Sequence, residues 1–518
     1  MGVRDVGRRL FLAGAALLFA FAGPARAGEG DAVDAAAAEA LLARGEAQAA
    51  LEAFLRLAEA PGGAEDVRVQ SGLAGARLAL GDPHGALPPL RTLARQRGDA
   101  EDHLRLADAL VAAAEANIAA GPQISAGVVP YLEDALVAAK APKEPSTETA
   151  ARLAFVAGRA HWLLGRAAET YAVLGHAGLA KDPAAQDLRA RAAYSTGAFA
   201  DAAAAWSAAG NRRGEAAAWS AARDARAVDL YRDLVKETPG DEILLDEAGM
   251  AASFVGRVDD WDRTLATLAT TPGQRAVVSR ARGRLMERAG RFADAEARHR
   301  EAVAAAPADG DLKKDLARVL VNRAGESDAA AVEAGAIYLA LLGESPDDAT
   351  VREGLDYLAQ REAALAPKEL PDTTRLDRAV AWFKALADTD PENPTSWAQL
   401  GVACRLAGAG AEAVAAYDRA VALNPFDPSL ENDRAIAVLA TGDRAGALVG
   451  FEKAAAADRN ETSPRQNAGR LRRQAGERDR ATVHWAEALA ATRTVGGTPM
   501  LYRSLLDRLW RDRAREGR

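Results

Sequence analysis

Two groups of polar side chains have the spacing needed to hold an anion. Within each group the residues stand four apart, so they share one face of an expected helix. The groups are Arg280, Arg284 and Arg288 on one helix and Lys314, Arg318 and Asn322 on the next. Like charges one turn apart destabilise their own helix by about 0.2–0.5 kcal/mol per pair, so we expect them to hold a carboxylate or another anion. The alternative is an ordinary solvated face that Glu287 and Asp315 balance.

No other set of residues predicts a reaction. The run Gly408–Ala413 matches G-x-G-x-x-A, but a helix rather than a strand is expected before it, so we interpret it as a turn. Phosphate-loop, zinc-protease and nucleophile-elbow motifs are absent from the sequence, and the six histidines show no ligand spacing. The single cysteine, Cys404, is interpreted as a small buried helix residue. We therefore expect no catalysis, no cofactor and no metal.

The helices that must position these side chains follow a regular sequence repeat, with a period of about 34 residues. Between Pro394 and Pro428 the sequence predicts two short helices joined by a turn at Gly408–Gly410. A turn glycine, two alanines and an aromatic residue then recur in register. These columns are Gly408, Gly442 and Gly476; Ala413, Ala447 and Ala481; Tyr417, Phe451 and Trp485; and Ala420, Ala454 and Ala488. Alanine is the best helix former and alternating β-branched runs are absent from the sequence, so the chain is predicted to be all-α.

The spacing W-x2-L-G, A-x3-Y and P within Pro394–Pro428 resembles the tetratricopeptide repeat, with Cys404 where the pattern has a large aromatic residue. The resemblance covers nearly all of the chain after its first thirty residues. It implies an all-α, right-handed superhelical solenoid of about thirteen helix-turn-helix repeats with a C-terminal capping helix. In this family the first helices line a concave groove, and the two polar groups would occupy groove-facing columns. In the last three repeats only Arg470 and Arg473 suit an anion, so the family's clamp for a C-terminal carboxylate is not expected.

The sequence divides into four segments. Residues 1–27 are a predicted signal peptide, 31–366 are degenerate repeats, and 372–497 are repeats, with clean units of the full period from 394. Pro367–Pro371 is the predicted hinge or boundary between two blocks of repeats. Residues 498–518 form a basic amphipathic helix, which we expect to cover the end of the stack. A membrane-surface or partner helix is the alternative for this last segment.

Residues 1–27 have the parts of an export signal. Arg4, Arg8 and Arg9 precede the apolar run Leu10–Ala22, and Ala25–Ala27 is an A-x-A cleavage site. The arginine pair also resembles a twin-arginine signal, although the usual polar residue before it and lysine after it are missing. Twin-arginine export, ordinary secretion and an uncleaved anchor all stay open. We expect an exported protein of the periplasm or cell envelope, with an extracellular location as the alternative.

Charge and repeats together favour an interaction protein. The chain has a net charge of −8, but residues 462–518 are strongly basic, which predicts contact with an acidic protein, an acidic envelope polymer or a membrane surface. Nucleic acid is not expected as a partner of an exported protein. We expect a non-catalytic scaffold in the cell envelope whose groove binds an extended peptide or helix with an acidic or carboxylate-bearing segment. The alternative is an accessory subunit of an envelope polysaccharide or peptidoglycan system that contacts a glycan or synthase. The sequence identifies neither the partner nor the oligomeric state.

Overall fold

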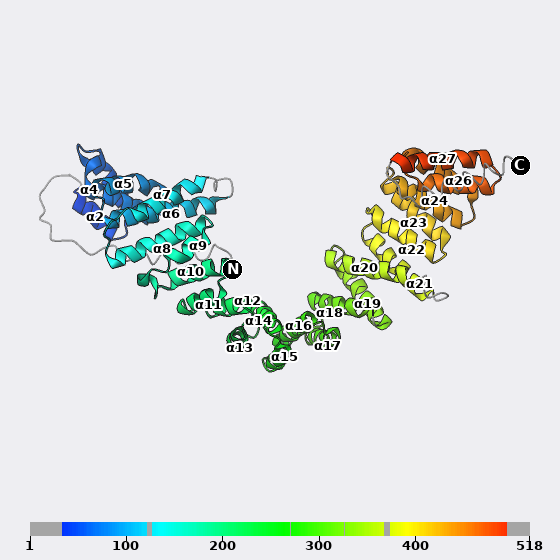
Figure 1. Ribbon diagram of the computed structural model, residues 1–518, viewed down its shortest axis with the longest axis horizontal. Coiled ribbons are helices and arrows are strands. Elements are labelled where there is room, and N and C mark those ends of the chain that lie inside the picture. Colours follow the sequence, from blue (N-terminus) through cyan, green and yellow to red (C-terminus); the bar gives the residue numbers. More distant parts are fainter. Residues whose placement is uncertain (1–33, 122–126, 270, 326, 367–372, 495–518) are drawn as a thin grey trace. The chain divides into compact units, whose positions relative to one another are not determined.

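The computed structural model describes residues 34–121, 127–269, 271–325, 327–366 and 373–494. In these ranges the chain forms 26 α-helices, α2 to α27, with two short 3-10 turns and no strand (Figure 1). Consecutive α-helices pair into thirteen hairpins. The predicted all-α fold of about thirteen helix-turn-helix repeats is therefore confirmed. The predicted signal segment 1–27, the break at 367–371 and the capping helix 498–518 lie outside the described residues.

Each hairpin consists of a first helix and a second helix. The first helices are α2 (Ala35–Ala43), α4 (Val67–Ala79), α6 (Ala100–Ala120), α8 (Thr147–Leu163), α10 (Pro183–Ser195), α12 (Arg212–Ala221), α14 (Glu242–Phe254), α16 (Pro272–Arg288), α18 (Gly310–Arg323), α20 (Ala349–Leu365), α22 (Pro394–Leu406), α24 (Pro428–Ala440) and α26 (Ser463–Gln474). The second helices are α3 (Ala47–Glu59), α5 (Pro83–Gln96), α7 (Val128–Lys140), α9 (Ala167–Val173), α11 (Phe199–Ala208), α13 (Arg226–Glu237), α15 (Val258–Ala266), α17 (Phe292–Ala305), α19 (Asp328–Glu344), α21 (Thr374–Thr389), α23 (Gly410–Leu423), α25 (Arg444–Ala457) and α27 (Arg478–Thr494).

A glycine in a left-handed conformation ends most of the first helices. Gly408 has φ +77°, and the amide of the next residue, Ala409, donates to the carbonyl of Cys404 at 2.9 Å. This is the hydrogen bond that closes a helix C-terminus in a Schellman motif, and it favours a residue without a Cβ. Gly442 and Gly476, each one repeat further along the chain, have the same conformation, so the predicted turns are confirmed.

Glycine also lets the two helices of a hairpin approach closely. A Cβ added at Gly401 on α22 would lie 2.7 Å from the ring of Tyr417 on α23, which is closer than real atoms pack. In this kind of pair the large residue follows its glycine by 16 positions. The other pairs are Gly158 with Leu174, Gly283 with His299, and Gly469 with Trp485. In a close-packed interface one partner must be small where the other is large, so each glycine makes room for the large residue of its own hairpin.

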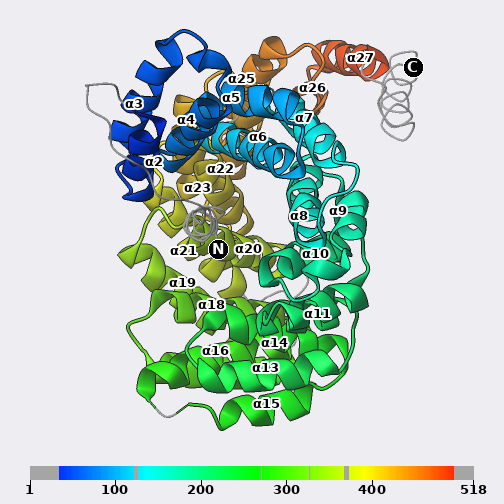
Figure 2. The same cartoon turned by 90° about the vertical axis from the view of Figure 1, so that its left-hand side faces the viewer.

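The described chain falls into two compact units, one ending at Trp261 and one beginning at Asp262. Within the first unit, hairpins α10–α11 and α12–α13 follow one another as stacked layers (Figure 2). Within the second unit, one hydrophobic cluster runs from Leu316 on α18 to Ala437 on α24. This cluster continues past residues 367–372, so the described core shows no boundary there. Cys404 is 2% exposed inside it, and burial raises the pKa of its thiol, as suits a packing residue.

Candidate partner-binding surface

The first helices of neighbouring hairpins pack side by side and form one layer of each unit. In the first unit α6 contacts α8 and α12 contacts α14, and in the second unit α18 contacts α20 and α22 contacts α24. We call the side of this layer that faces away from the second helices the open face. On α16 it carries Arg280, Arg284 and Arg288, because the buried residues of that helix lie on the opposite side.

The predicted basic group on α16 meets the group on α18 around a shared carboxylate. Arg280 donates through Nε to Oδ2 of Asp315 at 2.6 Å, and the Arg284 guanidinium lies 3.6 Å from the same oxygen. Arg318 donates to the other Asp315 oxygen at 3.1 Å and also binds Glu287. Three of the predicted cations therefore converge on Asp315 and Glu287, two carboxylates of their own chain.

These contacts hold both carboxyl groups ionised. Burial raises the pKa of the Asp315 carboxyl, but the hydrogen bond and positive charge of Arg280 outweigh burial, so its pKa lies below the ordinary value. For Glu287 burial also raises the pKa, and the hydrogen bonds from His299 and Arg318 outweigh it, so the net shift is again downward. The basic stripe and these two acids thus form one ion-paired network between α16 and α18.

Lys314 is paired in the same way with the next first helix. Its Nζ lies 2.7 Å from Asp311 and 2.9 Å from Asp348, which caps the start of α20. Its hydrogen bonds to Asp311 and Asp348 raise the Lys314 pKa, and the one from Lys314 lowers the pKa of Asp348. Lys314, Asp311 and Asp348 line a small open cleft of about 260 Å³ at the ends of α18, α19 and α20.

Three of the other four predicted residues are exposed. Arg288 and Asn322 are exposed at the C-terminal ends of α16 and α18. Arg470 is exposed on α26, and the Arg473 guanidinium lies 5.8 Å from the centre of the Trp485 ring. The structure therefore brings Arg280, Arg284 and Arg318 together and leaves the α26 pair several hairpins away. The role of the eight residues in binding a partner stays a prediction.

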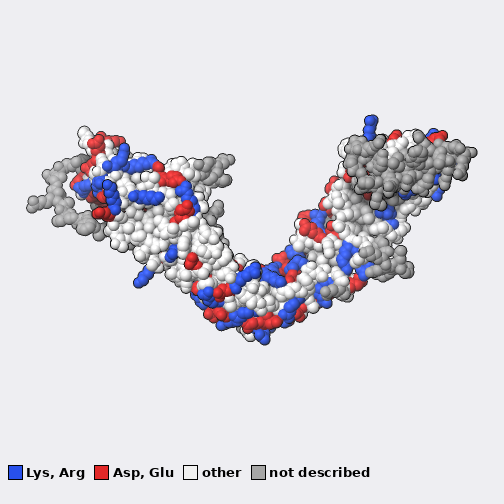
Figure 3. All heavy atoms as spheres, viewed as in Figure 1, with Lys and Arg blue, Asp and Glu red and all other residues white. Residues whose placement is uncertain are grey.

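Ion pairs between consecutive first helices recur elsewhere in the stack. Arg213 on α12 donates two hydrogen bonds to Glu247 on α14, each of 2.9 Å. Arg159 on α8 binds Asp108 and Glu115 on α6 at 2.8 and 2.7 Å. On the face drawn in Figure 3, basic and acidic side chains accordingly lie next to one another over the middle helices. Much of the charge on the first-helix layer thus connects one repeat to the next.

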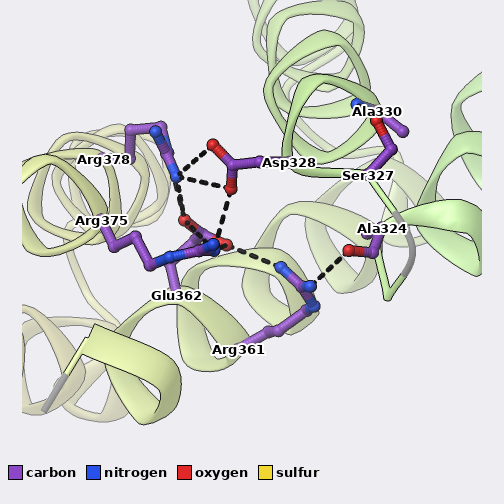
Figure 4. Close-up of polar contacts among 8 residues, drawn as sticks. All are labelled: Ala324, Ser327, Asp328, Ala330, Arg361, Glu362, Arg375 and Arg378. Carbon is purple, nitrogen blue, oxygen red and sulfur yellow. Dashed lines mark hydrogen bonds and ion pairs between the residues drawn. The ribbon is translucent and has the colours of Figure 1, made fainter. Parts of the chain in front are cut away.

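A second network surrounds a fully buried carboxylate near the end of α20 (Figure 4). Glu362 has no exposed surface, and its oxygens accept hydrogen bonds from Arg361, Arg375 and Arg378. Arg375 and Arg378 also bind Asp328 at the start of α19, with distances of 2.9 and 3.1 Å. Charge-assisted hydrogen bonds compensate for removing this carboxylate from water, so the cluster connects α19, α20 and α21.

The sequence analysis missed apolar side chains on the open face. Tyr357 on α20 is 57% exposed, and Ile243 on α14 is 67% exposed. Met250 and Phe254 share the face of Ile243, with 43% and 46% exposure. A signal was present, because Met250 stands one repeat before Arg284 and therefore occupies the same column. The sequence analysis considered only the cations of this column, as residues that could hold an anion, and not its apolar members.

The described residues make the packing contacts and ion pairs reported above. They contain no cluster of three or more His, Cys, Asp or Glu side chains with metal-binding geometry. Among them no helix is both long and apolar enough to cross a membrane.

Several solved structures resemble the chain at low sequence identity. No protein-family model matches the chain, and no curated protein sequence matches it. Among solved structures, MamA is 19% identical with a TM-score of 0.27, over 34% of this chain and 96% of its own. YrrB, described as a TPR protein with an unusual peptide-binding site, is 19% identical with a TM-score of 0.29, over 40% of this chain and 97% of its own. The Naa15/Naa10 complex bound to HypK-THB gives 13% identity and a TM-score of 0.36, over 86% of this chain and 75% of that one.

The assignment of the fold follows from the chain's own geometry. Glycine turns end most of the first helices, and in four hairpins a glycine on the first helix faces a large residue 16 positions later on the second. The chain therefore has an all-α fold of consecutive helical hairpins whose turn and packing positions match the tetratricopeptide pattern.

Proposed function

We propose that the chain is a non-catalytic scaffold that binds a segment of a partner protein along the open face of α20, α22 and α24. One observation carries the proposal: apolar side chains are exposed on this part of the layer. Tyr357 is 57% exposed and Leu406 is 38% exposed. Val402 and Ile436, one repeat apart, are partly buried in the same column.

A partner segment would bury this apolar surface. Covering apolar area is favourable by about 25 cal/mol per Å², and a column that passes from one hairpin to the next suits an elongated peptide or helix. The ion-paired faces of α16 and α18 offer less, because their cations already bind carboxylates of the chain. Within the second unit, the proposed surface is therefore more available to a partner than the faces of α16 and α18.

The acidic segment expected in the partner fits the end of this column. Arg470 on α26 stands one repeat after Ile436, is exposed, and pairs with no carboxylate among the residues that the structure describes. A partner with apolar side chains against Val402 and Ile436 would place a carboxylate near Arg470.

Site-specific photo-crosslinking in living cells tests this surface. A benzoylphenylalanine at position 357 or 406 should crosslink one partner protein through the same short segment. The matched control is position 449 on α25, where Val449 is 66% exposed but lies on a second helix. Arg470→Glu should weaken the crosslink at position 406. Equal crosslinking from positions 406 and 449, or none from either 357 or 406, contradicts the proposal.

We also propose that the protein acts in the cell envelope, which the pattern of residues 1–27 supports. The mature protein should then begin at Gly28 and fractionate with the periplasm or envelope. Sequencing the N-terminus of the protein isolated from its own cells measures this. A chain that keeps Met1 and stays in the cytoplasmic fraction contradicts the location and leaves the scaffold proposal intact.

A further inference from the structure

The most concentrated exposed apolar surface on one described first helix is on α14. Ile243, Met250 and Phe254 are 67%, 43% and 46% exposed. On a helix they fall within about 40° of one another, because residues i, i+7 and i+11 lie almost in line. The buried residues of α14, such as Leu245, Ala248 and Ala252, lie on the opposite side. The packing of α14 within the described stack therefore does not depend on these three apolar side chains.

Arg223 extends this surface from the neighbouring hairpin. It follows α12, and its guanidinium lies 5.6 Å from the centre of the Phe254 ring. α12 and α14 contact each other within the first unit. Arginine over an aromatic face is attracted by the ring, so the side chain is held beside Phe254 and remains exposed.

The backbone of Arg223 is strained. Its φ is +55°, and it is the one non-glycine residue with positive φ in the part of the chain that the structure describes. Most other first helices have glycine at this point. With Arg223 in its place the same Schellman hydrogen bond forms, from the Asp224 amide to the Trp219 carbonyl at 2.9 Å. A left-handed residue with a Cβ costs roughly 1–2 kcal/mol, so the arginine is retained at a cost to stability.

The charges around this surface favour an acidic ligand at one end. Among the described residues no carboxylate pairs with the Arg223 guanidinium. The adjacent Asp224 binds Arg226 instead, at 2.7 Å. At the other end of α14, the cation is Arg213, which already donates two hydrogen bonds to Glu247. Phe254 lies about 10 Å along the helix from Glu247, at 1.5 Å per residue. A carboxylate would therefore be attracted more strongly near Phe254 than near Ile243.

We propose that Ile243, Met250, Phe254 and Arg223 form a docking surface for a partner-protein segment with apolar side chains followed by a carboxylate. The apolar side chains cover Ile243, Met250 and Phe254, and the carboxylate pairs with Arg223. The binding direction is fixed because the cation at the Phe254 end, Arg223, binds no carboxylate of the described chain, whereas Arg213 at the other end is paired with Glu247. This surface belongs to the first unit and the α20–α24 surface to the second, and they consist of different residues, so either proposal can fail alone.

The test places benzoylphenylalanine at position 254, where an aromatic side chain already stands, and crosslinks in the cells that produce the full-length protein. Mass spectrometry of the crosslinked peptide identifies the contacted segment. The expected result is a peptide with aliphatic or aromatic residues and an Asp or Glu within one helical turn of the crosslink. Arg223→Glu should reduce its yield at least tenfold, and changing that acid to Lys should restore it. The control position is 137 on α7, where Val137 is 69% exposed on a second helix.

Each remaining outcome overturns the proposal. Crosslinking at position 254 no stronger than at position 137 shows that the surface is not specific. If Arg223→Glu leaves the crosslink yield unchanged, Arg223 does not pair with a carboxylate of the partner. Crosslinks to residues 495–518, or to a second copy of this chain, assign the surface to the protein itself. Circular dichroism melting of each variant confirms that the fold is kept, as expected for changes at exposed positions.

Discussion

The open faces of α14 and α16 use equivalent positions in opposite ways. Met250 and Arg284 stand one repeat apart, yet Met250 is an exposed apolar side chain and Arg284 lies 3.6 Å from Asp315. On α16, α18 and α20 charged residues of the open face form ion pairs that connect one repeat to the next. On α14 the open face instead carries exposed apolar side chains. The comparison teaches that one column of a repeat can stabilise the stack in one place and be available to a partner in another. An exposed charge on such a layer is therefore not by itself a binding site.

The largest effect is expected at Glu362. Glu362→Gln leaves three arginines around a buried neutral amide, and removing one partner of a buried ion pair costs about 3–5 kcal/mol. The midpoint of urea unfolding of the full chain should fall sharply. Glu353→Gln is the control, since Glu353 is exposed on the same helix and should change stability by less than about 0.5 kcal/mol. Equal effects from both changes would show that the buried cluster does not stabilise the stack.

Asp315→Asn should have a smaller but clear effect. The amide cannot compensate the charges of Arg280 and Arg318, and a buried donor left without its acceptor costs about 1–3 kcal/mol. The expected result is a lower midpoint of thermal unfolding. Asp311→Asn removes only an exposed ion pair with Lys314 and should cost no more than about 1 kcal/mol. If the two variants melt alike, the α16–α18 network is no stronger than a surface pair.

The same carboxylates predict a loss of stability in acid. Asp315 and Glu287 have pKa values below their ordinary values in the folded chain. Their contribution is therefore complete above about pH 4, where unfolded Asp and Glu ionise, and is lost as pH falls through the lower folded-state values. Melting temperature measured from pH 6 to pH 3 should fall below about pH 4. The fall should be shallower in Asp315→Asn, and an identical profile in both proteins contradicts the assignment.

Arg223→Gly should make the chain more stable. Relief of the left-handed strain favours the variant by roughly 1–2 kcal/mol, and the greater freedom of glycine in the unfolded chain offsets about 0.4–1 kcal/mol. The net gain is expected to be about 0.5–1 kcal/mol in urea unfolding. Arg223→Ala keeps the strain and removes the guanidinium, so it separates the two effects. A loss of stability in Arg223→Gly would mean that the contact with Phe254 outweighs the strain.

The smallest effect is expected at Ile243. Ile243→Ser changes a side chain that is 67% exposed, so stability should stay within about 0.5 kcal/mol of the original. A measured loss above about 2 kcal/mol, the size expected for a buried side chain, would show that the face of α14 is covered within the chain. That result would remove the contrast between α14 and α16.

Much of the fold could be predicted from local sequence, and less of the site could. Gly408, Gly442 and Gly476 mark turns because glycine best suits their backbone, and this information is contained in single residues. The acids Glu287 and Asp315 could be named beside the basic stripe, but their contacts depend on how α18 packs against α16. Arg223 was missed because its left-handed backbone cannot be recognised from an arginine in the sequence. Residues 1–27 and 498–518, which carry the export and capping predictions, lie outside the described residues.

The contact between Gly401 and Tyr417 has a consequence for how such a chain can change length over evolution. Both residues belong to one hairpin, 16 positions apart, so a duplicated hairpin brings its own packing contact and its own turn glycine. The networks around Asp315 and Glu362 instead draw residues from different hairpins, and an insertion between those hairpins would separate them. Duplication of a whole hairpin should therefore keep the packing within it, whereas an insertion between α16 and α21 should break these networks.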